Sequence, residues 1–175
     1  MPERDLLPIA AILYRQDDPI GPLMLEVARV LASRGVRLGG VLQHDHCDVP
    51  DDACAMEMEN LATGERFPLS LGAGGGTDAC RLDPASLAHA AVMIGKAVDD
   101  GVELVLINKF GAQEAAGAGL REEMGRALAT GVPLLTTVAE RFIDDWQSFT
   151  GGTATLLEPR LDNVLDWWAG VASGA

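Results

Sequence analysis

Short apolar runs separated by helical patterns are the feature that most constrains the fold of this chain. Pro8–Tyr14 (PIAAILY) and Leu104–Ile107 (LVLI) are apolar without alternation, which is typical of strands buried on both faces of a parallel sheet. Ile20–Ser33 repeats its apolar residues at helical spacing, and Val36–Gln43 returns to an extended pattern. This alternation of strand and helix predicts an α/β fold, in which helices flank a mostly parallel sheet.

A β-hairpin is expected to interrupt the alternation. Ala55–Asn60 alternates methionine with glutamate, and Glu65–Leu71 continues after a turn that contains Gly64, so a hairpin insertion is predicted over about residues 54–71. The other patterns predict helices over 83–99, 119–130, 140–149 and 163–171, a strand over 132–138 and an edge strand over 153–157. With 175 residues, the chain is expected to form one three-layer domain over residues 1–175.

Charge and composition limit the expected partners. Lys and Arg total 13 against 26 Asp and Glu, a formal net charge of −13, which would repel a polyphosphate backbone, so no nucleic acid is expected. The N-terminal residues lack the pattern of a secretory signal, and no run approaches the roughly 20 apolar residues of a membrane span. Three cysteines without CxxC spacing fit reduced thiols. We therefore expect a cytoplasmic protein without a membrane span.

Three stretches are expected to meet at one edge of the sheet. Ligands of open parallel sheets bind beyond the carboxyl ends of the strands, where loops converge and helix N-termini point at the crevice. Arg15–Gly21 follows the first predicted strand, Gln43–Asp48 follows the second, and Asn108–Glu114 follows the buried run LVLI. Gln43 is therefore a candidate ligand-binding residue.

The first of these stretches occupies the place of a P-loop but lacks its chemistry. Gly21-Pro22-Leu23 stands where a Walker A motif has Gly-Lys-Ser/Thr, so both the phosphate-binding lysine and the magnesium-binding hydroxyl are missing. Pro22 also removes a backbone donor. The helix N-terminus still offers N–H groups to a small anion, which makes Asp17, Asp18 and Gly21 candidate ligand-binding residues. The alternative is a plain strand-to-helix turn in which Asp18 is the N-cap.

Two further groups complete the candidate site. Asn108 and Lys109 stand where a Walker B carboxylate would hold magnesium, so Lys109 is a candidate anion ligand, with Glu114 to orient it or to accept a proton. The alternative is that Asn108 only ends the strand and Lys109 points into solvent. Cys80 and Arg81 lie between a glycine-rich loop and a helix, where they could close over a ligand, although a core thiol and an ion pair of Arg81 with Asp83 are the favoured explanation.

Other conspicuous residues favour structural roles. Cys47 and Cys54, with His44 and His46 nearby, form a loosely spaced soft-donor group, but we expect a solvated loop over 44–52 and no metal site. The tryptophans are expected to cover a core or an interface. Trp167-Trp168, near the end of the sequence, is a candidate contact for a homo-oligomer.

Five segments resemble a bacterial family of uncharacterised nucleoside-triphosphatase-like proteins, often encoded near molybdate-transport genes. They are RGVRLGGVLQ (34–43), CAMEMENLATGERFPLS (54–70), CRLDP (80–84), NKFGAQEAAGAGLREEM (108–124) and GVPLLTTV (131–138). Their order is similar to that of the thermophile-type nucleoside triphosphatases, in which a P-loop, a Thr-Gly hairpin and an Asp-Glu-Ile-Gly-Lys segment follow one another. The resemblance implies a P-loop-type scaffold that has lost magnesium-nucleotide chemistry and serves molybdate or tungstate handling.

Three functions follow as hypotheses. The first is a non-hydrolysing protein that binds a small tetrahedral oxyanion, with nucleotide a less favoured ligand. The second is a divergent nucleotide hydrolase or nucleotide-dependent maturation factor that uses Lys109 and Glu114. The third is a regulatory or scaffold subunit that keeps the fold for protein contact alone.

Overall fold

Seven strands form one mixed sheet in the order β4-β3-β2-β5-β6-β1-β7. We describe a computed structural model over residues 8–15, 17–46, 55–68, 84–110, 112–117, 120–152 and 154–173. The strands are β1 (Ile9–Tyr14), β2 (Leu38–His46), β3 (Ala55–Asn60), β4 (Arg66–Pro68), β5 (Leu104–Phe110), β6 (Leu134–Ala139) and β7 (Thr155–Leu157). The helices are α1 (Ile20–Ser33), α2 (Pro84–Asp99), α3 (Ala112–Ala115), α4 (Arg121–Thr130), the 3-10 turn η1 (Glu140–Phe142), α5 (Ile143–Thr150) and α6 (Leu161–Ser173).

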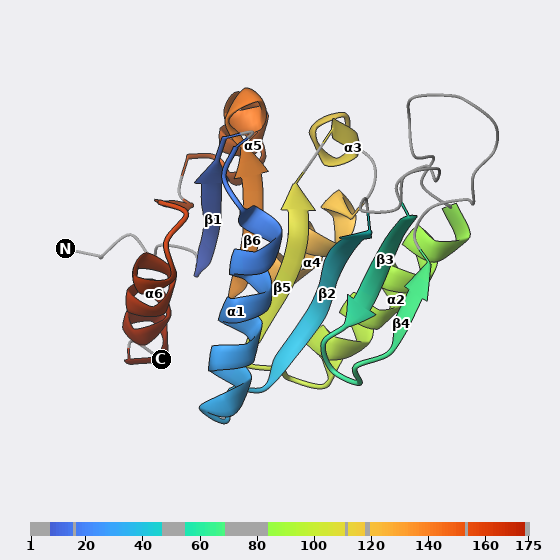
Figure 1. Cartoon of the computed structure of the whole chain (residues 1–175). Coiled ribbons are helices and arrows are strands. Elements are labelled where there is room, and N and C mark those ends of the chain that lie inside the picture. Colours follow the sequence, from blue (N-terminus) through green and yellow to red (C-terminus); the bar gives the residue numbers. More distant parts are fainter. Residues whose placement is uncertain are drawn as a thin grey trace.

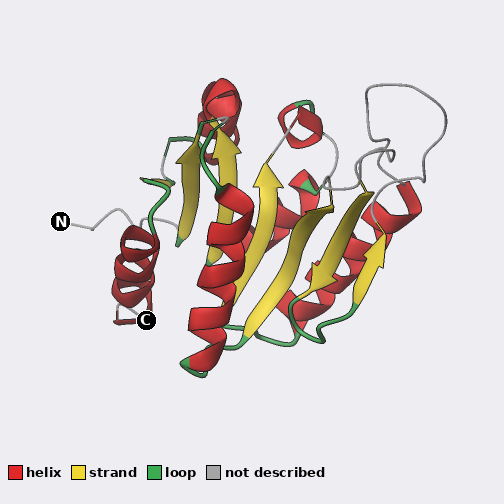
Figure 2. Ribbon diagram, in the orientation of Figure 1, coloured by secondary structure: helices red, strands yellow, loops and turns green. Residues whose placement is uncertain are grey.

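The expected three-layer α/β architecture with an inserted hairpin is confirmed. β2, β5, β6, β1 and β7 run parallel, and β3 and β4 add antiparallel strands at one edge. Helix α1 crosses the front of the sheet with α6 beside it, and α2 and α4 lie behind (Figures 1 and 2). β1 and β2 are not neighbours, because β5 and β6 lie between them.

Each face of the sheet has its own apolar core. The side chains of β1 alternate, so that Ile9 and Ala11 pack with Trp146 and the residues of α2 and α4, whereas Ala10 and Ile12 pack with α1 and α6. Trp146 is fully buried, as expected of a core tryptophan. Trp168 is buried in the core beneath α6, so it is not available as the oligomer contact that the sequence suggested, and Trp167 packs half-buried against the same core.

The structure corrects several predicted boundaries. β2 continues through His44 to His46, where we expected a loop, because it pairs with β3 up to the His46–Ala55 position. β5 continues through Asn108 to Phe110, where we expected the strand to end at Ile107. The helix predicted over 119–130 begins at Arg121, and a short helix over Ala112–Ala115 was not predicted.

Two glycines allow β2 to pack closely against its neighbours. A Cβ at Gly39 would lie 2.5 Å from Cβ of Ala97 on α2, and a Cβ at Gly40 would lie 2.0 Å from the carbonyl oxygen of Leu106 on β5. Gly40 also has φ +100°, a conformation that favours glycine. The pair Gly39-Gly40 therefore sets how closely β2 approaches both α2 and β5.

No helix in the part of the chain that the structure describes is long and apolar enough to cross a membrane.

Candidate functional site

A cavity of about 430 Å³ opens where the carboxyl ends of β1, β2 and β5 meet the start of α1. We call it the edge cavity. Its lining comprises Tyr14, Asp18, Pro19, Ile20, Gly21, Pro22, Leu25, Gln43, His44 and Asn108. Residues from all three stretches that the sequence singled out are among them, because parallel strands place their carboxyl ends at one edge of the sheet. The predicted site residues Asp18, Gly21, Gln43 and Asn108 thus lie around one cavity.

The loop before α1 closes on itself. The side chain of Asp18 accepts a hydrogen bond of 2.7 Å from the Arg15 N–H, and the Asp18 carbonyl accepts one of 2.8 Å from the Ile20 N–H. The N-cap position belongs to Pro19, which has no side-chain cap, so our assignment of Asp18 as the N-cap was wrong. The carboxylate instead accepts a backbone hydrogen bond within the loop that precedes α1.

One donor remains at the start of α1. The N–H of Gly21 donates to no acceptor among the described residues, and a Cβ there would have no atom within 4 Å apart from its chain neighbours and the nearby helix backbone. The next residue, Pro22, has no N–H, and the Leu23 N–H is bonded to the Pro19 carbonyl. The helix therefore presents the Gly21 N–H to the edge cavity, at the positive end of the α1 dipole.

Asn108 lies at a β-bulge. Ile107 pairs with Thr136 and Phe110 pairs with Val138, so Asn108 and Lys109 together face the one residue Thr137. The Thr137 hydroxyl donates a 2.8 Å hydrogen bond to Oδ1 of Asn108, and the neighbouring Thr136 hydroxyl donates to the Ile107 carbonyl. The bond from Thr137 uses the amide oxygen of Asn108, which leaves its NH₂ group as the donor for the cavity. Asn108 is only 6% exposed.

His44 is a cavity residue that the sequence analysis did not select. Its side chain is 8% exposed, and its Nε2 lies 3.0 Å from Oε1 of Glu59 on β3. A second ion pair holds Glu59, whose Oε1 is 3.5 Å from Nη2 of Arg66 on β4. The signal in the sequence was the alternation of Glu57 and Glu59 opposite an HDH segment, which is compatible with paired strands.

The remaining predicted site residues do not line the edge cavity or lie outside the described residues. Asp17 lines an adjoining cavity of about 730 Å³ together with Tyr14, Arg15, Ala139, Glu140 and Arg141. Glu114 is buried in α3, and its backbone carbonyl accepts a hydrogen bond of 3.1 Å from Arg121. The backbone of Lys109 belongs to β5, but its side chain lies outside the described residues, as do Cys80 and Arg81.

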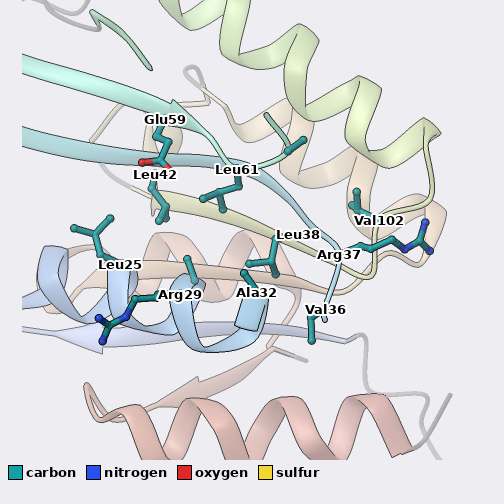
Figure 3. Close-up of a pocket in the computed structure, with 12 residues that line it drawn as sticks. Leu25, Arg29, Ala32, Val36, Arg37, Leu38, Leu42, Glu59, Leu61 and Val102 are labelled. Atoms are coloured by element: carbon teal, nitrogen blue, oxygen red, sulfur yellow. The ribbon is translucent and has the colours of Figure 1, made fainter. Parts of the chain in front are cut away.

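A third cavity shares Leu25 with the edge cavity and runs along α1. This groove, of about 520 Å³, lies between α1 and the β2-β3 pair (Figure 3). Leu25 borders both cavities, and Glu59, the partner of His44, lines the groove. Figure 3 shows a mainly apolar lining with two arginines, Arg29 and Arg37. Arg37 already contacts Glu103 at 3.6 Å and donates to the Gly101 carbonyl at 3.0 Å.

The described residues hold no group of three or more His, Cys, Asp or Glu side chains arranged to bind a metal ion. The polar residues that line the edge cavity supply amide donors, one imidazole, one carboxylate and one phenol. Such a lining can bind a small anion through neutral hydrogen-bond donors and a helix N-terminus.

Comparison with known proteins identifies related sequences. The model of a family described as "Protein of unknown function (DUF2478)" matches residues 9–167. The chain is also 40% identical, over 165 residues, to the molybdenum import ATP-binding protein ModC 2 of Bradyrhizobium diazoefficiens. The match covers 94% of this chain and 18% of that protein. The chain thus spans less than a fifth of the length of this relative.

Proposed function

Because the chain belongs to the family described as a protein of unknown function (DUF2478), and a similar segment occurs in a molybdenum import ATP-binding protein, we propose that it binds molybdate. The ligand class is a small tetrahedral oxyanion, of which tungstate is a second member. Binding takes place in the edge cavity and involves no nucleotide hydrolysis. The name of the relative supports the choice of molybdate among such anions.

The buried amide of Asn108 on β5, which borders the same cavity as the start of α1, is the observation that carries this proposal. Its oxygen is used by Thr137, so its NH₂ group and the Gly21 N–H are donors that border the same cavity. An anion placed between them receives hydrogen bonds and the positive end of the helix dipole. Both donors come from rigid elements, which fixes their spacing before the ligand arrives.

The same residues argue against ordinary nucleotide hydrolysis. Hydrolysis on a P-loop requires a lysine on the phosphates and a magnesium ion held by a hydroxyl and a carboxylate. Here Pro22 and Leu23 occupy those Walker A positions, and Asn108 occupies the position of the Walker B carboxylate. The Asp18 carboxylate also accepts the hydrogen bond of the Arg15 N–H. The alternative of a divergent hydrolase predicts magnesium-dependent phosphate release from ATP, lost in Glu114→Gln.

A thermal-shift and calorimetric comparison of molybdate, tungstate, sulfate, phosphate, ATP and GTP, with and without magnesium, tests the proposal. A ligand that binds only the folded protein raises its stability, by about 2.7 kcal/mol at a hundred times its Kd. We expect stabilisation by molybdate and tungstate without magnesium. Stabilisation by ATP alone would favour the hydrolase, and no shift with any ligand would favour the scaffold function.

Asn108→Asp is the sharpest variant for this test. The new carboxylate keeps an oxygen for Thr137 but replaces the NH₂ donor by a negative oxygen, so molybdate binding should be lost. The matched control is Asn60→Asp, since Asn60 is similarly buried and its Oδ1 accepts a hydrogen bond from the Ala62 N–H away from the cavity. If both variants bind molybdate like the parent protein, the edge cavity is not the site.

Lys109 remains a predicted ligand. We expect Lys109→Ala to weaken molybdate binding without unfolding the protein, because an ammonium group near a dianion strengthens its binding. An unchanged affinity in calorimetry would remove Lys109 from the site and leave the assignment of Asn108 standing.

A further inference from the structure

The charge balance of the edge cavity is unfavourable for a dianion in the described residues alone. Asp18 contributes a carboxylate, and neither lysine nor arginine is among the residues that line the cavity. Arg15, which precedes Asp18 by three residues, forms an ion pair with Glu140 instead, with 3.3 Å between its Nε and Oε2 of Glu140. A positively charged group at the cavity would therefore strengthen the binding of a dianion beyond what the neutral donors provide.

His44 is the lining residue that can provide it. Histidine changes its charge between about pH 5 and 8, within the range in which proteins work. The imidazole of His44 borders the cavity and is held from the other side, where its Nε2 meets Oε1 of Glu59 at 3.0 Å. The Glu59 carboxylate forms an ion pair with the ring when the ring is protonated.

We infer that His44 binds the oxyanion as an imidazolium, so that each anion is bound together with a proton taken from solvent. This inference rests on the proposed function. With Nε2–H donated to Glu59, neutral His44 presents Nδ1 as an acceptor, which an oxyanion repels. Protonation at Nδ1 turns it into a second N–H donor and adds one positive charge, and no covalent bond forms or breaks.

The surrounding charges favour this uptake. On β3, Glu59 contacts His44, and Glu57 is its partner in the β2–β3 register. On β4, Arg66 lies 3.5 Å from Glu59 and 4.0 Å from Glu57. The loop before α1 adds Asp18, and Asn108 on β5 adds only a neutral amide. When His44 is neutral, the three carboxylates outnumber the single arginine around it. A proton on His44 reduces this excess of negative charge when the anion binds.

The sign of the pH dependence follows directly. Because binding takes up a proton, molybdate affinity rises as pH falls and decreases as pH rises. The partner Glu59 also lines the groove of Figure 3, so the pair links the ligand site to that surface.

Isothermal titration calorimetry tests the inference in buffers of different ionisation enthalpy, at about pH 6.5 and about pH 8, which bracket the titration of histidines. For the parent protein we expect tighter molybdate binding at the lower pH and net uptake of a proton at the higher pH. His44→Gln keeps a donor for Glu59 but cannot be protonated. It should lose the proton uptake and roughly ten- to a hundredfold of the affinity at the lower pH, the size of a charged hydrogen bond.

His89→Gln is the matched control, because His89 lies on α2 and is exposed, 3.9 Å from Glu65. It should change neither affinity nor proton uptake. If His44→Gln fails to fold, NMR of the three histidine rings in the parent protein decides the question. Molybdate should shift the His44 ring toward its protonated form at about pH 8.

The outcomes separate the two claims. Molybdate binding without proton uptake, or with an unchanged His44 ring, overturns the role of His44 and leaves the proposed function intact. Absence of molybdate binding at both pH values overturns the proposed function, and the inference with it.

Discussion

The hydroxyl of Thr137 donates a hydrogen bond of 2.8 Å to the side-chain oxygen of Asn108, across the point where β5 and β6 lose their register. Both side chains are buried. The bond holds the amide in one orientation and so determines which of its two polar groups reaches the edge cavity. A threonine outside the cavity thus positions the donor that we propose for the anion.

Replacing Thr137 by valine should cost both stability and binding. The variant keeps the shape but leaves Oδ1 of Asn108 without its donor, which should lower the free energy of unfolding by about 1–3 kcal/mol. The released amide can turn, so molybdate affinity should also fall. Urea denaturation and calorimetry measure the two effects. Thr136→Val is the control, because Thr136 bonds the Ile107 carbonyl and its loss should reduce stability alone. Equal affinities in both variants would contradict the positioning role.

Replacing Asp18 by asparagine should strengthen oxyanion binding. Asparagine keeps an oxygen for the Arg15 N–H and removes a negative charge from the cavity lining. We expect molybdate affinity to rise by roughly three- to tenfold, since a nearby like charge in a partly exposed site is worth on the order of 1 kcal/mol. Weaker binding in calorimetry would indicate that a cation bound by Asp18 takes part, as a nucleotide site would require.

Gly40 should not tolerate a side chain. Alanine there would have its Cβ 2.0 Å from the Leu106 carbonyl oxygen at φ +100°, which should lower the free energy of unfolding by more than about 3 kcal/mol. Gly125 in α4 is the control, because no atom lies within 4 Å of its Cβ position. Gly125→Ala should stabilise the protein by about 0.5–1 kcal/mol. Thermal or urea unfolding of both variants checks the contrast, which equal stabilities would refute.

Trp146 should be replaceable by phenylalanine at small cost. Its ring is fully buried, and its Nε1–H has no acceptor among the described residues. Trp146→Phe leaves a small void but removes an unpaired buried donor, so stability should stay within about 1 kcal/mol of the parent. Trp146→Ala, which removes the packing against Phe110 and Phe149, should cost about 3–5 kcal/mol. A large loss in the phenylalanine variant would show that the N–H has a partner.

The spacing of apolar residues in the sequence predicted most strands and helices of this fold, because burial against the core determines that spacing. The run Pro8–Tyr14 and the periodicity of Ile20–Ser33 correspond to β1 and α1, because burial on one or both faces imposes a period that neighbouring residues show. The hairpin of β3 and β4 was predicted for the same reason, from alternation and a glycine turn. The position of the edge cavity followed from a rule about parallel sheets, which needs no side-chain detail.

Strand ends and buried polar contacts could not be predicted in this way. β2 extends to His46 because β3 supplies hydrogen bonds there, and β5 extends to Phe110 because Val138 of β6 pairs with it. Neither partner is a sequence neighbour. Asp18 was a candidate N-cap of α1, but its carboxylate accepts a hydrogen bond from the Arg15 N–H instead. An aspartate in a turn can accept from either kind of backbone N–H, so the sequence does not distinguish the two.

The amino-acid sequence by itself determined the α/β class, the place of the hairpin, the absence of a Walker A motif and the edge of the sheet at which the candidate residues meet. Only the tertiary structure decided that Asn108 is held by Thr137 and that His44 is buried against Glu59. The physical reason is sequence separation. Periodicity reports how a residue faces the core, whereas a hydrogen bond between strands depends on register, which is set when distant segments pair.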